Sequence, residues 1–149
     1  LTMTDMGDFN VLVDYAHNKA GYDALIDFVS SYNPEKTIMT LCVPGDRRDE
    51  DFESIAESCA NNIDTIVLFE SYLRGLEEGE ISEKLKKYLM KYGMEDDQII
   101  IIYDEQSAVQ YCLDVGGQYD FVILSNYDVD DTHFKIQAHK EKLEQEKSA

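Results

Sequence analysis

Five short apolar segments alternate with segments of helical periodicity, and this alternation limits the possible folds of the chain more than any other feature. Each apolar run is almost continuous, as is typical of strands that are buried on both faces. The predicted strands cover residues 9–15, 36–43, 64–70, 98–104 and 119–125. The predicted helices cover residues 18–31, 49–61, 79–92, 105–115 and, in the highly charged tail, about 130–147.

Buried strands that are separated by helices predict a Rossmann-like, doubly wound α/β fold. We expect a mostly parallel sheet of about five to six strands with helices on both faces and right-handed crossovers. No repeat or linker divides the chain, so the 149 residues are predicted to form a single domain. The last residues of its tail, about 130–149, are expected to fray.

Composition excludes several classes of partner. The chain carries 13 basic and 31 acidic residues, a net charge of −18, which repels nucleic-acid phosphates and anionic lipid. The apolar runs are too short to span a bilayer, and no signal segment is present. Cys42, Cys59 and Cys112 are widely spaced, as buried free thiols are. We therefore predict a cytoplasmic protein without nucleic-acid or membrane partners.

Polar residues gather directly after the first three predicted strands. They form the segments DYAHN, PGDRRDED and ESYLRGLEEGE, at residues 14–18, 44–51 and 70–80. Because the carboxyl ends of parallel strands meet at one edge of a sheet, we expect these segments to converge there. Ligands bind at that edge in this architecture.

The residue types in these segments suit a nucleotide. Arg47 and Arg48 lie in a glycine-containing loop beside a predicted helix start, where an anion is favoured. Asp14 is suited to hold a ribose diol, and His17 with Asn18 can donate to a phosphate. No phosphate-binding loop of the GxxxxGK[ST] type and no GxGxxG are present, so a second domain is expected to hold the triphosphate.

Structural alternatives exist for each of these residues. Asn18 and Asp49 are also suitable helix caps, and the paired arginines are also compatible with a solvated loop. A receiver-like regulatory module, in which Asp14 accepts a phosphoryl group, is a second hypothesis. A third is a metal site formed by His133 and His139 with nearby aspartates, although a six-residue spacing does not place both histidines on one helical face.

The segment VLVDYAHNKAGYDAL, residues 11–25, resembles the start of the C-terminal domain of the Mur ligase superfamily. This superfamily includes muramyl-peptide ligases, folylpolyglutamate synthetases and cyanophycin synthetases. Its usual pattern is Asp, a small or aromatic residue, Ala, His, Asn and Pro, and this chain departs from it only at Lys19. PGDRRDED followed by LFESYLRGLEEGEI is most similar to the cyanophycin synthetase branch, and the matches span residues 9 to 85.

The resemblance implies the C-terminal lid of a larger ATP-dependent amide-bond ligase. A central ATPase domain of the same polypeptide would hold ATP and most contacts to Mg²⁺, and the lid would close over ATP and the incoming amino acid. An acyl phosphate would form on the acceptor and be attacked by the amino group. We expect an Asp-rich peptide chain extended by Asp or Arg, and an excised lid that is inactive alone.

The resemblance also assigns roles to residues. It implies a nucleotide-binding set and a substrate-binding set, while the chain is expected to hold no metal of its own. The nucleotide-binding set is Asp14, His17, Asn18 and Arg47. The substrate-binding set is Arg48, Asp49, Arg74 and Glu80. The sequence leaves open which of the two adjacent arginines contacts a ligand, and whether the parent is another Mur-type ligase.

Overall fold

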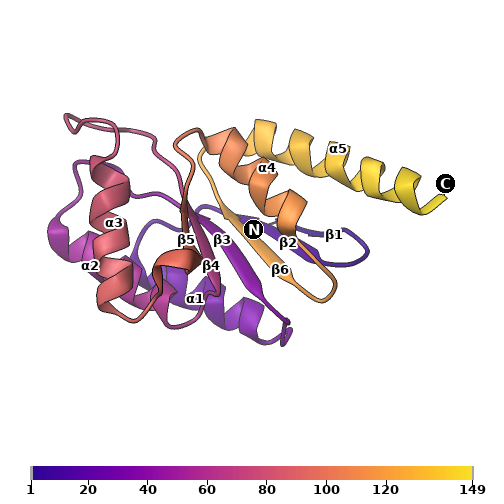
Figure 1. The fold of residues 1–149 in the computed structure, drawn as a ribbon, viewed down its shortest axis with the longest axis horizontal. Coiled ribbons are helices and arrows are strands. Elements are labelled where there is room, and N and C mark those ends of the chain that lie inside the picture. The colour runs from indigo at the N-terminus through magenta and orange to yellow at the C-terminus, as the bar shows by residue number, and fades with distance from the viewer. Residues whose placement is uncertain (1, 149) are drawn as a thin grey trace.

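A mostly parallel sheet lies between two layers of helices in the computed structural model, which describes residues 2–148 (Figure 1). The strand order across the sheet is β1-β2-β6-β3-β4-β5, and every neighbouring pair is parallel except β1 with β2. The strands are β1 Thr2–Asp5, β2 Asn10–Asp14, β3 Thr37–Leu41, β4 Thr65–Leu68, β5 Ile99–Ile101 and β6 Phe121–Ser125. The predicted Rossmann-like α/β class is confirmed.

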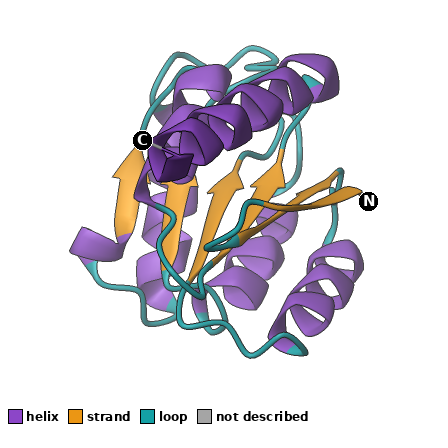
Figure 2. Cartoon of the chain, turned by 90° about the vertical axis from the view of Figure 1, so that its right-hand side faces the viewer, coloured by secondary structure: helices purple, strands orange, loops and turns teal. Residues whose placement is uncertain are grey.

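Helices cover both faces of the sheet (Figure 2). The helices are α1 Lys19–Ser30, α2 Asp49–Ala60, α3 Glu80–Lys91, α4 Glu105–Val115 and α5 Val129–Ser148, with a 3₁₀ turn at Asp96–Gln98. On one face α2 packs between α1 and α3, and on the other α4 packs against α5. Each helix starts and ends within one residue of its predicted position, including the helix of the charged tail.

The strand β1 was not among the predicted strands. It forms an antiparallel hairpin with β2, in which Thr2 pairs with Val13 and Asp5 with Asn10. The turn is closed by the Met6 amide, which donates to the Phe9 carbonyl at 2.9 Å. A four-residue edge strand with mostly exposed side chains has little apolar pattern, so its position depends on pairing with β2 rather than on its own sequence.

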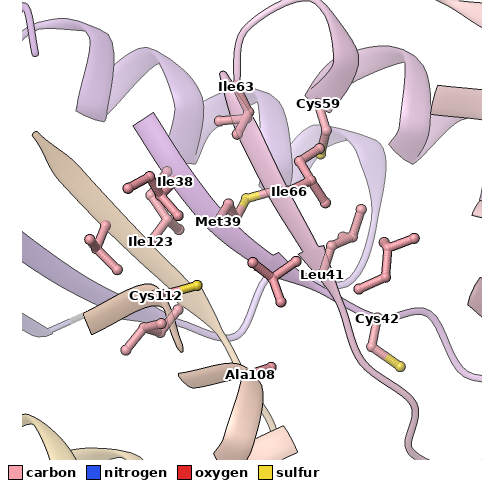
Figure 3. Packing of buried hydrophobic residues seen from close by; sticks show 14 of the residues in the cluster. Ile38, Met39, Leu41, Cys42, Cys59, Ile63, Ile66, Ala108, Cys112 and Ile123 are labelled. Atoms are coloured by element: carbon pink, nitrogen blue, oxygen red, sulfur yellow. The ribbon is translucent and has the colours of Figure 1, made fainter. Parts of the chain in front are cut away.

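The central strands form the middle of the hydrophobic core. All five residues of β3 and all five of β6 are buried, because helices cover both sides of these strands. Figure 3 shows Met39 and Ile66 from neighbouring strands packed between Cys59 of α2 and Cys112 of α4. Each fully buried aliphatic side chain contributes about 1.5–3 kcal/mol relative to exposure.

The three cysteines are free and buried, as predicted. Burial raises the pKa of the Cys42 and Cys112 thiols to about 12. Burial also raises the pKa of Cys59, on α2. These thiols therefore stay protonated near neutral pH and act as small apolar side chains of the core.

In the strand order β6 lies between β2 and β3, and the helix that follows β6, α5, covers the opposite face of the sheet from the helices that follow those two strands. Such reversals open a crevice at the carboxyl ends of the strands. No helix within residues 2–148 has the length and apolar content needed to cross a membrane.

Candidate functional site

The loops that follow β2, β3 and β4 leave the sheet at one edge, because these strands run parallel to one another. We call this the carboxyl edge. Asp14 ends β2 and lies in register with Ser125 at the end of β6. The predicted convergence of the three polar segments at one edge is therefore confirmed, and the first of them follows β2, the neighbour of β6 in the sheet.

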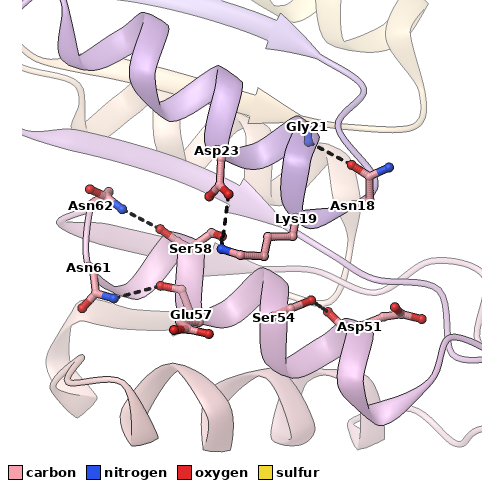
Figure 4. Close-up of polar contacts among 10 residues, drawn as sticks. All are labelled: Asn18, Lys19, Gly21, Asp23, Asp51, Ser54, Glu57, Ser58, Asn61 and Asn62. Atoms are coloured by element: carbon pink, nitrogen blue, oxygen red, sulfur yellow. Dashed lines mark hydrogen bonds and ion pairs between the residues drawn. The ribbon is translucent and has the colours of Figure 1, made fainter.

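In the first loop, two predicted residues keep their side chains available. Asp14 is half-buried, and its carboxylate makes no hydrogen bond or ion pair within residues 2–148. His17 is exposed, and its Nδ1 lies 3.3 Å from the Tyr15 carbonyl oxygen. Asn18 is the N-cap of α1, where its Oδ1 accepts the Gly21 amide at 2.8 Å (Figure 4).

Lys19, which replaces the usual proline, fixes this turn through its side chain. Its Nζ donates to the hydroxyl of buried Ser58 on α2 at 2.8 Å, and pairs with Asp23 at 3.2 Å (Figure 4). The hydrogen bond from Ser58, followed by the ammonium of Lys19, holds the pKa of Asp23 below its usual range. The first turn of α1 is thus tied to α2 by a contact that the sequence did not reveal.

The second loop separates the two adjacent arginines. Arg48 is at the N-cap position of α2, and its guanidinium donates to the Asp51 carboxylate at 3.2 and 3.3 Å. The hydrogen bond to Asp51 raises the pKa of Arg48. Asp49 pairs with Lys84 of α3 at 2.9 Å. Arg47 is exposed, and its guanidinium has no hydrogen-bond or ion-pair partner within residues 2–148. Arg47 is therefore the member of the pair that is free to meet an anion.

The predicted anion site at the start of α2 is weaker than the sequence suggested. The first turn of α2 contains Asp49, Glu50 and Asp51, which already complement the positive end of the helix. Arg48 is also engaged by two of these carboxylates. Cationic attraction at this loop consequently depends on Arg47.

The third loop is fastened to the second. The Gly45 amide donates to the Tyr72 carbonyl at 3.0 Å, and a Cβ at Gly45 would lie 1.9 Å from the Leu73 carbonyl oxygen. The Arg74 guanidinium pairs with Asp46 at 3.2 Å and lies 5.3 Å from the centre of the Tyr72 ring. Both Tyr72 and Arg74 have positive φ angles, 53° and 52°. Only a residue as small as glycine permits the two loops to approach this closely.

Glu80, the last predicted residue, has a local contact. Its carboxylate accepts the Glu77 amide at 2.6 Å, in the turn that begins α3. The Glu70 carboxylate also accepts backbone amides at the start of α3, those of Gly79 and Ser82, at 2.8 and 3.0 Å. The carboxylates of Glu70 and Glu80 are therefore occupied by backbone amides at the start of α3.

Neither Tyr127 nor Glu105 is among the residues predicted from the sequence, because the family matches end at residue 85. Tyr127 follows β6 at the carboxyl edge, and its ring makes edge contacts with Tyr15 and Tyr72, with centres 5.5 and 5.1 Å apart. Glu105 accepts the backbone amides of Tyr127 and Asp128. The sequence signal that could have identified both is their position, since each is a polar or aromatic residue just after a predicted strand.

Asn126 lies beneath the same edge. It is 1% exposed, and its Oδ1 accepts the Thr40 hydroxyl at 2.7 Å. The Thr40 hydroxyl in turn accepts the Ser125 amide at 3.0 Å. Among residues 2–148 the buried Asn126 Nδ2 has no hydrogen-bond partner, so it is an unpaired donor beneath the carboxyl edge.

An acidic groove runs along the carboxyl edge beyond β6 and β4. It consists of two adjoining hollows of about 530 and 470 Å³, which share Ser71 and Glu105. The other lining residues are Tyr72, Tyr127, Asp128, Val129, Asp130, Glu70, Leu73, Glu78, Tyr103 and Asp104. Because arginine and lysine are absent from this lining, the groove suits a cationic group better than a phosphate.

A cavity of similar size lies at the opposite edge of the sheet. It measures about 540 Å³ and is lined by residues such as Tyr32, Tyr119 and Asp120, which precede strands rather than follow them. None of the predicted site residues borders it. None of them lines the two hollows of the carboxyl edge either. Ligands of parallel sheets bind at the carboxyl ends of the strands, so the carboxyl edge remains the stronger candidate.

The described residues do not fit a metal ion. Within residues 2–148, no three His, Cys, Asp or Glu side chains converge as metal ligands. His139, one of the two histidines of the metal hypothesis, is buried on α5 with its Nδ1 3.8 Å from Asp114 and 3.5 Å from Gln110.

Comparisons with known proteins agree with this arrangement. Residues 2–125 match the family model "Mur ligase, glutamate ligase domain". A cyanophycin synthetase of Nostoc sp. strain PCC 7120 is 33% identical over 125 residues, which are 83% of this chain and 14% of that protein. The chain thus spans about one seventh of this curated relative.

Solved structures share the fold. A UDP-N-acetylmuramoyl-L-alanyl-D-glutamate–2,6-diaminopimelate ligase superposes with a TM-score of 0.73 at 16% identity, over 92% of this chain and 31% of that one. A bifunctional folylpolyglutamate synthase/dihydrofolate synthase from Yersinia pestis, solved with AMPPNP and a manganese ion, has a TM-score of 0.65 at 14% identity, over 91% and 30%. The chain belongs to the Mur ligase C-terminal domain family.

Proposed function

We propose that this chain is the lid domain of an ATP-dependent acid–amino-acid ligase of the cyanophycin synthetase type. One observation carries the proposal. Three polar loops meet at the carboxyl edge beside β6. There Asp14 and Arg47 have side chains without hydrogen-bond or ion-pair partners within residues 2–148, and His17 uses only its Nδ1, toward the Tyr15 carbonyl oxygen. Groups that the fold leaves unpaired at a ligand-binding edge are available for a ligand.

The first two loops would contact the nucleotide. Asp14 would accept hydrogen bonds from a ribose diol, and His17 and Arg47 would approach the phosphates. Asn18 remains suitable although it caps α1, because the cap uses only its Oδ1 and leaves Nδ2 to donate. A mobile lid that brings such donors to the phosphates on closure would exclude water and stabilise the charge of phosphoryl transfer.

The third loop and the groove would meet the incoming amino acid. Arg74 is half-exposed above Tyr72, so its guanidinium is accessible to a carboxylate although it pairs with Asp46. Arg48, Asp49 and Glu80 are engaged in contacts of α2 and α3, and a substrate would have to compete with these. Between the two expected residues, the acidic groove favours arginine over aspartate for addition to the Asp-rich chain.

The chemistry would be completed by a central domain of the same polypeptide. That domain would hold the triphosphate and Mg²⁺, since residues 2–148 contain neither a phosphate loop nor a cluster of metal ligands. The acceptor carboxylate would take the γ-phosphoryl group, and the amine would displace phosphate to form the amide. We expect the isolated domain to be inactive. Its family membership leaves the receiver-like alternative without support.

Calorimetry of this domain with a non-hydrolysable ATP analogue tests the proposal. We expect no measurable binding to the isolated domain, and binding once the central domain is present. In the assembled ligase, Arg47→Ala should lower ATP affinity about tenfold, as expected for a lost charged hydrogen bond, while Lys36→Met, a loss of charge at the opposite edge, should not. An ATP affinity that is the same in all three proteins would contradict the proposed nucleotide contact.

The amino-acid substrate is tested by product analysis of the assembled ligase. Incorporation of arginine, and not of aspartate, into a poly-aspartate primer with release of ADP is the expected result. Activity only on muramyl peptides or folates would assign the chain to another branch of the superfamily.

A further inference from the structure

A single ring touches two loops of the site that do not otherwise share an aromatic contact. Tyr127 contacts Tyr15 of the first loop and Tyr72 of the third, with ring centres 5.5 and 5.1 Å away, and Phe69 at 6.0 Å. The interplanar angles lie between 70° and 88°, which is the favourable edge-to-face arrangement. Tyr127 therefore stands between the two loops as a spacer of fixed width.

The position of this ring is fixed by the rest of the fold. Its hydroxyl donates to the Cys42 carbonyl at the end of β3, at 3.4 Å. Its backbone amide donates to Glu105 of α4 at 2.6 Å. Burial raises the pKa of Tyr127, so the phenol stays neutral and keeps its donor at physiological pH. Anchors on β3 and α4 thus hold the ring in place from two sides.

Both neighbours of the ring carry residues of the proposed site. Tyr15 lies between Asp14 and His17, and it is 55% exposed. Tyr72 lies under the Arg74 guanidinium and is 50% exposed. Besides Tyr127, the Tyr15 ring has one aromatic neighbour within residues 2–148, His17, and the Tyr72 ring has one cation–π neighbour, Arg74. A movement of Tyr127 would therefore be passed to both loops.

We propose that Tyr127 is a positioning residue, which sets the separation between the nucleotide-side loop at Tyr15 and the substrate-side loop at Tyr72. Its effect on catalysis rests on the proposed function, whereas the mechanical coupling of the two loops does not. The reacting groups of two bound substrates must lie at a fixed separation, and a displacement of about 1 Å can lower the rate of such a reaction about a hundredfold.

A double-mutant cycle in the isolated domain tests the coupling by NMR. In the otherwise unchanged chain, Tyr15→Leu should shift the backbone amide resonances of Tyr72, Leu73 and Arg74. In a chain that already carries Tyr127→Leu, Tyr15→Leu should shift these amide resonances at least about threefold less, because substitutions at contacting residues do not have additive effects. Tyr127→Phe keeps the ring and should keep the coupling.

The matched control is Tyr32→Leu, which removes a ring of similar exposure, 45%, at the opposite edge. It should leave the amides of the third loop unchanged. Equal shifts from Tyr15→Leu with and without the Tyr127 ring would overturn the proposal. Circular dichroism identifies any variant that has not folded, and the Phe variant then gives the comparison.

The catalytic consequence is measured in the assembled ligase. Tyr127→Leu should lower kcat about tenfold to a hundredfold with little change in KM for ATP, because the nucleotide still binds but is misaligned with the amino acid. Tyr127→Phe should stay within about twofold of the parent. Equal losses with Leu and Phe, or a rise in KM alone, would contradict positioning. Absence of ligase activity in the parent would contradict the proposed function and leave the NMR result standing.

Discussion

The two halves of the carboxyl edge differ in how their charged groups are used. After β4, β5 and β6, the carboxylates of Glu70, Asp104, Glu105 and Asp128 accept backbone amides of nearby turns and helix starts. After β2 and β3, by contrast, Asp14 and Arg47 make no hydrogen bond or ion pair through their side chains within residues 2–148, although Arg48 and Asp49 beside them are engaged. Charge alone therefore does not identify a site, since most of the acidic groups on this edge stabilise the fold.

This difference between engaged and unengaged residues predicts how substitutions will affect stability. Residues that are engaged by the fold should lower stability when they are replaced, whereas unengaged residues should affect only ligand binding. The following substitutions test this difference, and they are ordered from the largest expected loss of unfolding free energy to the smallest.

Gly45→Ala should cause the largest loss, about 3 kcal/mol, because overpacking at a rigid backbone site is strongly unfavourable. The new Cβ would lie 1.9 Å from the Leu73 carbonyl oxygen, so the second and third loops would have to separate. Gly75→Ala is the control: its φ is +95°, but no atom lies within 4 Å, and only about 1 kcal/mol of backbone strain is expected. Urea unfolding measures both, and equal losses would show that the loops are not packed as a unit.

Glu70→Ala should lower the unfolding free energy by about 1–2 kcal/mol, since two amides at the start of α3 lose their acceptor. Glu78 lines the same groove, but its exposed carboxylate accepts no hydrogen bond within residues 2–148. Glu78→Ala should therefore change stability by less than about 0.5 kcal/mol. A similar cost for both would remove the distinction between capping and unengaged carboxylates.

Lys19→Met should cost about 1 kcal/mol, because buried Ser58 loses its hydrogen-bond donor. Lys19→Pro should restore most of this. Residue 19 is the first of α1, where proline is well tolerated, and Asn18 already has the extended φ and ψ of −147° and 170° that a following proline requires. Thermal unfolding compares the two variants, and a proline variant less stable than the methionine variant would refute this account.

The loss of unfolding free energy at low pH should depend on the carboxylates that accept hydrogen bonds in the folded domain. The hydrogen bond from Arg48 lowers the pKa of Asp51, and hydrogen bonds from Ser107 lower that of Asp104. A lowered folded-state pKa contributes stability above the unfolded value of about 3.9, and this is lost as the pH falls through the folded value. Urea unfolding, measured in steps of about one pH unit from pH 5 to 2, should therefore show a fall in the unfolding free energy. This fall should be smaller in Asp51→Asn, which cannot titrate at that position.

Arg47→Ala should have the smallest effect on stability, within about 0.5 kcal/mol, because its side chain is exposed and makes no ion pair within residues 2–148. The adjacent Arg48→Ala is the natural comparison, since it removes the ion pairs with Asp51 and Glu50 in the first turn of α2 and should destabilise the domain more than Arg47→Ala does. If Arg47 proved the more destabilising of the two, the assignment of Arg48 to the fold and Arg47 to the ligand would be reversed.

Much of the fold could be predicted from the sequence because its pattern is strong. Near-continuous apolar runs such as those of β3 and β6 have few alternatives to a doubly covered parallel strand, and the helices were predicted to within one residue. The strand β1 was missed, because a short edge strand is defined by its neighbour. The resemblance to Mur ligases identified the loops, and the structure confirms that they share one edge.

The sequence by itself determined the succession of strands and helices, and hence the edge at which Asp14, Arg47 and Arg74 emerge. These depend on periodicity, which is local and visible in one chain. Only the tertiary structure decided that Arg48 is engaged while Arg47 is not, and that Tyr127 joins two loops. The Tyr127 contacts bring together residues more than fifty positions apart, so they depend on strand order and crossover direction, which a hydrophobic pattern does not specify. The Arg48–Asp51 pair spans three positions, and it depends on the geometry of the first turn of α2.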